Sequence, residues 1–422
     1  MLFYRILAGG ALLAYSPVAL LRAVRGRRRP GDIGGRLGWK PYPDLAGGVW
    51  IHAVSVGEVG VASSLLAALS RREPGRRFGL SVTTEAGRAL AQRIAPDGVD
   101  VFAFPFDLAG PVERALDRVR PGLVLLTETE LWPLFLARAS SRGIPVAVVN
   151  GRISERSYPR YRLLRRWFAP ALDSVALFVM QSDEDARRIE ALGAPRSKIR
   201  MNGNVKYDVP EPPPFRDSER LLEAAAGRPI VVAGSTDEAE EGAVLAAASA
   251  LSARTLLAVA PRRPERFGEL ARKVESAGLA LRRRTGEDRG PADVYLLDTI
   301  GELSALYAHA ALAFIGGSLV PRGGHNPIEA WAAGVSVIVG PHTENFREVI
   351  ARGMELGIAT RVPESRDLGG SIDQELSDRP ALSARGAKAR QFVAANRGAA
   401  DATAAEVLSL LPEPTARRGA AG

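Results

Sequence analysis

Three carboxylates in the first half of the sequence could do acid–base chemistry. Glu58 lies three residues after Ser55, the spacing of a capping box, so its side chain either satisfies a backbone donor or faces a ligand. The positive end of a helix dipole would keep this carboxylate ionised, and an ionised carboxylate can take a proton from an attacking hydroxyl. Glu128 and Glu130 precede a Trp-Pro pair. One of them could be the first-turn acid of the next helix, which leaves the other to face a ligand.

Two basic residues could meet negative charge. Lys206 stands just before the proline-rich stretch 210–214, where a lysine is either simply solvated or placed beside a developing negative charge. Arg262 directly follows a strand-like run, and a guanidinium group can bind two phosphate oxygens at once. The alternative for Arg262 is an ordinary surface arginine in the run PRRPER.

The stretch 311–341 predicts a strand, a glycine-rich loop, a short helix and a second strand. Asn326 suits the N-cap, Pro327 the first helical position, and Glu329 has capping-box spacing from Asn326. Gly334 would end the helix in the left-handed conformation. Such a βαβ unit aims free backbone N–H groups at an anion such as a nucleotide phosphate, and Glu329 could accept hydrogen bonds from ribose hydroxyls. An ordinary capped helix in a parallel sheet is the alternative.

Composition narrows the classes of function. A chain of 422 residues predicts two domains. The absence of cysteine excludes disulfides and thiolate chemistry, and four histidines argue against a histidine-rich metal centre. The net charge of +9 could indicate nucleic acid, but no basic stretch carries interleaved aromatic residues or a known nucleic-acid module. We therefore expect no nucleic-acid partner.

The amino-terminal residues 1–24 predict a membrane anchor. Leu2–Leu21 is mostly apolar, and the arginines between positions 22 and 29 follow it without a cleavage site. The positive-inside tendency places the rest of the chain on the cytoplasmic side. Whether this helix crosses the bilayer or lies in its interface stays open, because Arg5 and Pro17 favour the second arrangement.

Strand-like and helical runs alternate along both halves, which predicts an α/β fold with open, mostly parallel sheets. Ligands on such sheets bind at the carboxyl ends of strands, where the candidate residues stand. The strand–turn–capped-helix pattern at Glu58 recurs at residues 230–238, so the two halves look like related sheet domains. The prolines at 210–214 indicate a linker, and one long last helix is expected to cross back over the first domain.

Eight motifs occur in order along the chain: HAVSVGE, TETELWP, NGRIS, GNVKYD, AGSTDE, APRRPERF, DTIGEL and GGSLVPRGGHNPIEA. With them the sequence resembles the 3-deoxy-D-manno-octulosonic acid (Kdo) transferases of lipid A and lipopolysaccharide biosynthesis over nearly its whole length. The resemblance implies the GT-B glycosyltransferase fold, with two Rossmann-like domains facing a cleft. The expected division is an anchor at 1–24, an acceptor-binding domain at 25–209, a linker at 210–228, a CMP-Kdo-binding domain at 229–382, a helix crossing back at 383–411 and a disordered tail at 412–422.

The resemblance also assigns roles and partners. It implies transfer of Kdo from CMP-Kdo to a lipid A precursor (lipid IVA) at the cytoplasmic face of the inner membrane, with inversion and with neither metal nor cofactor. Glu58 would be the general base, and Glu128 and Lys206 would support the transition state. The residues expected to bind CMP-Kdo are Pro261, Arg262, Ile300, Gly301, Glu302, Asn326, Pro327, Ile328 and Glu329. Two positions of the AGSTDE motif depart from the family pattern: Asp237 stands where the family usually has histidine, and Ala239 stands where glycine is common.

Two rival functions remain at this point. Another GT-B nucleotide-sugar enzyme, such as a UDP-sugar transferase or a 2-epimerase, would fit the glycine-rich unit but not HAVSVGE or ETELWP. A non-catalytic, membrane-anchored scaffold is the other, and the presence of Glu58, Arg262 and Glu329 argues against it.

Overall fold

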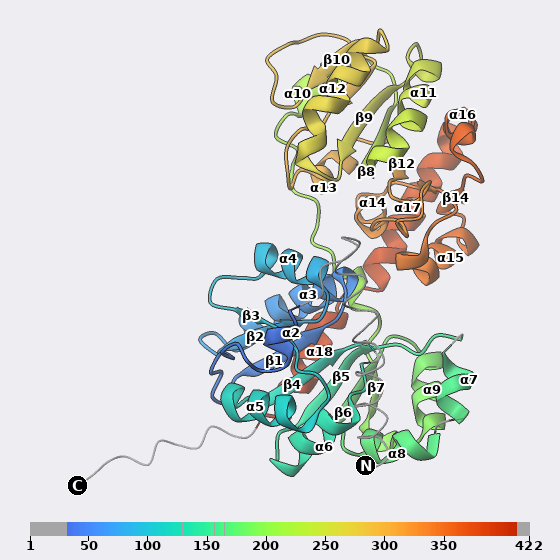
Figure 1. The fold of residues 1–422 in the computed structure, drawn as a ribbon. Helices are drawn as coiled ribbons and strands as arrows, with labels where there is room; N and C mark the ends of the chain where they lie inside the picture. Colours follow the sequence, from blue (N-terminus) through green and yellow to red (C-terminus); the bar gives the residue numbers. More distant parts are fainter. Residues whose placement is uncertain (1–31, 129, 156, 164, 412–422) are drawn as a thin grey trace. The chain divides into compact units, whose positions relative to one another are not determined.

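The computed structural model describes residues 32–128, 130–155, 157–163 and 165–411. It divides into two compact units, with the first ending at Asp208 and regaining the chain from Asn396 onward, and the second running from Val209 to Ala395 (Figure 1). The expected anchor at 1–24 and the tail at 412–422 lie outside the described residues. Within the described ranges, no helix is both long enough and apolar enough to cross a bilayer.

The first unit is built on a seven-stranded, wholly parallel sheet in the order β3-β2-β1-β4-β5-β6-β7. Its strands are β1 (Val49–Ala53), β2 (Phe78–Val82), β3 (Asp100–Phe102), β4 (Leu123–Thr127), β5 (Val146–Gly151), β6 (Leu177–Met180) and β7 (Ile199–Met201). The helices are α2 (Ile33–Arg36), α3 (Val56–Arg72), α4 (Glu85–Ile94), α5 (Ala109–Val119), α6 (Pro133–Ser141), α7 (Tyr158–Leu163), α8 (Arg165–Asp173), α9 (Asp183–Leu192) and α18 (Ala399–Leu408).

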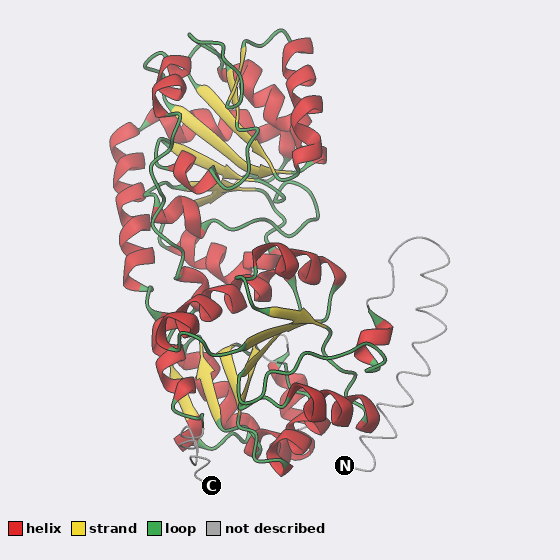
Figure 2. Cartoon of the chain, turned by 90° about the vertical axis from the view of Figure 1, so that its left-hand side faces the viewer, coloured by secondary structure: helices red, strands yellow, loops and turns green. Residues whose placement is uncertain are grey.

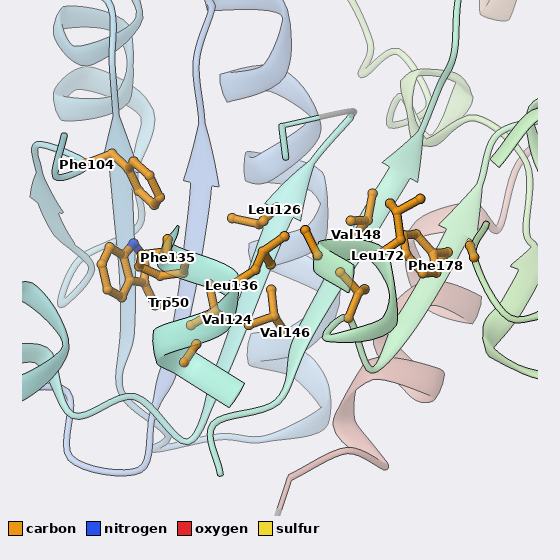
Figure 3. Packing of buried hydrophobic residues seen from close by; sticks show 14 of the residues in the cluster. Trp50, Phe104, Val124, Leu126, Phe135, Leu136, Val146, Val148, Leu172 and Phe178 are labelled. Carbon is orange, nitrogen blue, oxygen red and sulfur yellow. The ribbon is translucent and has the colours of Figure 1, made fainter. Parts of the chain in front are cut away.

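The sheet of the first unit is buried on both faces, because successive side chains of a strand point to opposite sides. From β1, Trp50 packs in one apolar cluster with Phe104 and Phe135, as Figure 3 shows, while Val49 and Ile51 join a second cluster that includes residues of α3. Helices cover both faces of each sheet (Figure 2). The strands therefore appear in the sequence as continuous apolar runs.

The second unit repeats this plan with the order β10-β11-β9-β8-β12-β13-β14, again all parallel. Its strands are β8 (Ile230–Thr236), β9 (Leu256–Pro261), β10 (Leu281–Arg283), β11 (Val294–Leu296), β12 (Leu312–Ile315), β13 (Val337–Val339) and β14 (Ala359–Arg361). Its helices are α10 (Ser218–Ala225), α11 (Glu241–Leu251), α12 (Phe267–Ser276), α13 (Leu303–Tyr307), α14 (Ile328–Ala332), α15 (Arg347–Glu355), α16 (Leu368–Ser377) and α17 (Arg379–Ala395). Two parallel-sheet α/β domains, as the sequence predicts, are thus confirmed.

Strand order reverses once in each sheet, between β1 and β4 in the first unit and between β8 and β12 in the second. At such a switch point the loops leaving the two strands diverge to opposite faces and leave a crevice at the carboxyl edge, where ligands of open α/β sheets bind. Glu58 follows β1 and Glu128 follows β4. The topology therefore brings these two carboxylates to one switch point.

The sequence-based prediction of one long last helix over 383–411 is wrong. The structure has two helices, α17 and α18, with Gly398 between them at a φ of 100°, a conformation that ends regular helix for most residues. The carboxylate of Asp208 accepts hydrogen bonds from the backbone N–H groups of Gly398 and Ala400 and so caps α18. Helix α18 packs against α3, within the first unit.

The stretch 210–228, expected as a linker, is partly helical. Helix α10 occupies its second half, and Phe215 is buried against the rings of Tyr295 and His309. The proline-rich residues 209–214 before it have no regular secondary structure.

Candidate active site

Glu58 is held by four hydrogen bonds at the carboxyl end of β1. One carboxylate oxygen accepts from the Ser55 backbone N–H (3.2 Å) and hydroxyl (2.9 Å), and the other from the Val54 N–H (2.9 Å) and the Thr127 hydroxyl (3.0 Å). Ser55 also caps α3 by accepting from the Glu58 N–H, so the capping box is complete. The side chain is only 7% exposed. Glu58 is therefore a cap, and its carboxylate at the same time stands at the switch point.

The environment makes Glu58 more basic than an ordinary glutamate. Burial raises its pKa, the backbone hydrogen bond from Val54 opposes that rise, and the negative charge of Glu128 adds to it. A carboxylate with a raised pKa holds a proton more tightly once it has taken one, which favours a general base.

Glu128 and Lys206 meet across 78 positions of sequence. The Lys206 ammonium group donates to Glu128 at 2.9 Å, and both side chains are largely buried. Glu128 has a φ of 54°, in the left-handed region that non-glycine residues seldom occupy, so its backbone is strained. Lys206 lies in the short 3-10 turn Val205–Tyr207, whose first N–H groups are fixed by Asn150 and Asn204. The structure thus brings together all three residues expected to be catalytic.

Glu130, a candidate in the sequence to which the resemblance gave no role, is a third carboxylate of this cluster. Its pKa rises to about 7, first through burial and then through the negative charges of Glu58 and Glu128, while Arg36 opposes the rise. Arg36 comes from α2, donates to the Phe104 carbonyl (3.2 Å) and stacks its guanidinium group on Phe106 (4.1 Å). The motif ETELWP carries the signal of a second acid, but only the fold reveals its neighbours.

Neither Glu128 nor Glu130 is the first-turn acid of the following helix, contrary to the sequence interpretation. Helix α6 has no acidic residue in its first turn. Asp107, which the sequence analysis missed, instead accepts from the backbone N–H groups of Leu134 (3.0 Å) and Phe135 (2.7 Å). Both glutamates of ETELWP are thereby released from a capping role.

In the second unit, the helix expected at Asn326 begins one residue later than the capping-box reading requires. Asn326 accepts from the Ile328 N–H at 2.9 Å and donates to Glu329 at 3.4 Å, and Pro327 occupies the N-cap position of α14. Burial raises the pKa of Glu329, whereas Asn326 and the nearby Arg262 oppose the rise. Gly334, at a φ of 83°, follows the end of α14 as predicted.

The sequence predicts that the glycine-rich loop after β12 offers free N–H groups to a ligand. In the structure, two of these N–H groups are already bound within the protein. The carboxylate of Glu240, only 1% exposed, accepts from the N–H groups of Gly317 (2.7 Å), Leu319 (2.8 Å) and Asp237 (2.9 Å). This internal anion fills the place at the switch point of the second sheet where backbone donors converge. These three N–H groups are therefore not available to a bound phosphate.

The remaining donor candidates also lie after strands of the second sheet. Pro261 ends β9 and Arg262 is exposed directly after it, with its backbone N–H bonded to Thr236. The loop between β11 and α13 carries the exposed Ile300, the left-handed Gly301 (φ 88°) and Glu302. Burial raises the pKa of Glu302, but hydrogen bonds from Thr299 and Arg284 outweigh burial. The pKa therefore lies below its ordinary value.

Across the parts of the chain that the structure describes, no group of three or more histidine, aspartate or glutamate side chains is arranged to hold a metal ion.

Comparison with known proteins identifies the family. A family model described as 3-Deoxy-D-manno-octulosonic-acid transferase (kdotransferase) matches residues 31–209. A 3-deoxy-D-manno-octulosonic acid transferase of Bordetella pertussis is 37% identical over 379 residues, which cover 86% of this chain and 88% of that protein. A protein of the same name from Haemophilus influenzae is 32% identical over 397 residues, 92% of each chain.

Solved structures share the fold at low sequence identity. The glycosyltransferase of kitacinnamycin is 16% identical with a TM-score of 0.54, covering 87% of this chain and 100% of its own. A putative UDP-N-acetylglucosamine 2-epimerase from Listeria monocytogenes is 14% identical with a TM-score of 0.52, covering 87% and 96%. Because a transferase and an epimerase fit equally well, the fold alone does not separate the rival functions, whereas the curated relatives do. The chain belongs to the 3-deoxy-D-manno-octulosonic acid transferase family, and it is a glycosyltransferase.

Proposed function

We propose that this chain transfers Kdo from CMP-Kdo to a sugar hydroxyl of lipid IVA, with inversion and without a metal ion, and that Glu58 is the general base. The observation that carries the proposal is the Glu58 carboxylate, buried, raised in pKa and placed at the switch point beside the Glu128–Lys206 pair. Membership of the Kdo transferase family supports the transferred sugar, and the CMP-linked donor follows from the resemblance.

Glu58 can give up one of its four hydrogen bonds and so accept a proton from the substrate. The Thr127 hydroxyl has a single hydrogen and two acceptors, Glu58 at 3.0 Å and the His52 carbonyl at 2.8 Å. When it donates to His52, one lone pair of Glu58 becomes available at little cost. An acceptor hydroxyl can then donate to that lone pair, lose its proton to Glu58 and attack the anomeric carbon of Kdo.

The movement of charge in the reaction suggests roles for Arg262, Lys206 and Glu128. The attacking oxygen forms the new bond as the bond from the anomeric carbon to the CMP oxygen breaks, so negative charge moves to the departing phosphate. Arg262 supplies positive charge on the donor-binding unit, and Lys206, oriented by Glu128, supplies it near the base. Direct displacement on the face opposite to CMP inverts the anomeric configuration.

The acceptor requires a membrane surface, and helices α7 and α8 support such a partner. Leu163 is 85% exposed, and the surrounding arginines at positions 160, 162, 165 and 166 are all exposed. An exposed apolar side chain among cations suits the interface of an anionic leaflet, where each basic residue contributes about 1 kcal/mol. We place the chain at the cytoplasmic face of the inner membrane, held there by its amino-terminal segment.

The test is transfer itself. Purified chain is incubated with CMP-Kdo and lipid IVA in the presence of EDTA, and the lipid product is analysed by mass spectrometry. Addition of one or more Kdo masses with release of CMP is the expected result. Transfer from a UDP-sugar but not from CMP-Kdo, or transfer abolished by EDTA and restored by a divalent ion, would contradict the proposal.

A further inference from the structure

A small cavity of about 130 Å³ on the second unit is lined by Pro210, Pro212, Ser304 and Glu329. All four residues belong to that unit. Because one water molecule needs only about 10–15 Å³ of such space, the cavity has room for a group of several atoms, such as a sugar ring.

The polar wall of the cavity comes from α13 and α14, which pack against each other. Ser304 is on α13 and presents a hydroxyl, while Glu329 on α14 presents a carboxylate. Among the described residues, the second oxygen of Glu329 accepts no hydrogen bond, and the first accepts only a long one from Asn326. The side chain of Tyr307, one turn along α13 from Ser304, is buried. Burial and the negative charge of Glu329 both raise the pKa of its hydroxyl. A carboxylate with an oxygen free to accept hydrogen bonds, placed beside a hydroxyl group, can bind the two hydroxyls of a vicinal diol.

The apolar wall is the segment that leaves the first unit. Proline has no N–H group and a fixed φ, so residues 210–214 form a stiff extended stretch. Phe215 anchors this stretch by packing into the second unit against Tyr295 and His309, and the Ser218 hydroxyl bonds the Phe215 carbonyl. The rings of Pro210 and Pro212 are thereby held over the cavity as an apolar face.

We infer that Ser304 and the two prolines complete a ribose-binding pocket on Glu329, so that the connecting segment is itself part of the donor site. This inference rests on the proposed function, because it takes the ligand to be the nucleoside part of the donor. Ser304 is a specificity-determining residue for the ribose diol, and Pro212 is a packing surface for the sugar.

The experiment compares CMP with 2′-deoxy-CMP by isothermal titration on the full chain. Wild type should bind CMP at least about ten-fold more tightly, because the diol donates to a charged acceptor. Ser304→Ala should weaken CMP about five-fold and narrow the difference between the two nucleotides. Ser276→Ala, at the exposed end of α12, is the matched control and should change neither value.

The prolines are tested in the same way. Pro212→Ala should weaken both nucleotides equally, while Pro213→Ala, exposed and outside the cavity lining, should leave both unchanged. Equal binding of CMP and 2′-deoxy-CMP to wild type, or a Ser304→Ala variant with wild-type discrimination, would overturn the inference and leave the proposed function standing. Absence of CMP binding to the wild type would instead defeat the proposed function, and this inference with it.

Discussion

Glu58 completes the capping box of α3, and the proposed reaction uses the same side chain as a base. Its four hydrogen bonds fix the orientation that a base needs, yet the single proton of Thr127 is shared between two acceptors. Because burial outweighs those hydrogen bonds, its pKa is raised and not lowered.

The raised pKa predicts a pH profile. A general base works only when deprotonated, so kcat/KM should fall as the pH drops through the pKa of Glu58, and this limb should lie at higher pH than for a free glutamate. Glu128→Gln removes a negative charge that raises this pKa. The acid limb of that variant should therefore move to lower pH, apart from any loss of rate. A limb that stayed in place, or moved to higher pH, would show that Glu58 is not the group that titrates. Glu130, whose pKa is about 7, can add a second limb, and Glu130→Gln identifies it.

The Glu128–Lys206 pair makes a second prediction. Lys206→Met removes the cation near the base and leaves Glu128 uncompensated, so kcat should fall by about 10²-fold with little change in CMP affinity. Lys388→Met, on an exposed face of α17, is the control. If Lys206→Met kept wild-type kcat, the pair would be purely structural.

Contacts between residues that are close in sequence could be predicted, whereas contacts between remote residues could not. The capping-box spacing of Ser55 and Glu58 is local and was predictable, and so was the left-handed Gly334. The contact of Lys206 with Glu128 and the cap that Asp107 provides for α6 join residues 78 and about 27 positions apart. No local pattern encodes such pairings, and only the order of strands in the sheet creates them.

At the scale of elements, the loops at the second switch point are joined by Glu240. Its carboxylate accepts from three backbone N–H groups, two on the loop after β12 and one on the loop after β8. From the sequence, the loop after β12 was predicted to bind an anion, because its glycines suggested backbone N–H groups without partners. A buried glutamate 77 residues earlier already supplies the anion.

Glu240→Gln is the sharpest test of this arrangement. The amide keeps the shape of the side chain, but whichever way it is turned its NH₂ group faces a backbone N–H donor. We expect a loss of about 3 kcal/mol in the free energy of unfolding, measured by urea denaturation. Glu265→Gln, on an exposed position after β9, should cost almost nothing. Equal stability of the two variants would mean that the loops hold together without this carboxylate.

The elements themselves were predictable where apolar runs and caps agree. The parallel strands follow from uninterrupted apolar stretches such as Leu123–Leu126, since both faces of the sheet are covered. The break near Gly398 was missed because the residues on both sides of it favour helix. What fixes the start of the separate helix α18 is a contact with Asp208, which is remote in sequence.

At the scale of the whole molecule, the proposal requires the enzyme to work at a bilayer. Deleting residues 1–24 should leave CMP affinity unchanged, because the second unit contains every residue assigned to the donor. Transfer to lipid IVA in anionic vesicles should drop at least ten-fold, while transfer to detergent-dispersed lipid should be retained. In the shortened chain, Leu163→Asp should reduce the remaining binding to vesicles, measured by sedimentation. Equal transfer in vesicles with and without residues 1–24 would show that these residues do not hold the enzyme at the membrane.

A single-turnover transfer assay with CMP-Kdo, lipid IVA and EDTA tests whether Glu58 is the general base. It compares Glu58→Gln with Glu85→Gln, the exposed first-turn acid of α4. Thermal unfolding and CMP titration verify that both variants are folded and bind the nucleotide. We expect Glu58→Gln to lose about 10²- to 10⁴-fold in the rate of Kdo transfer, while Glu85→Gln transfers at the wild-type rate. A folded Glu58→Gln variant that binds CMP normally and transfers Kdo at the wild-type rate would contradict this expectation.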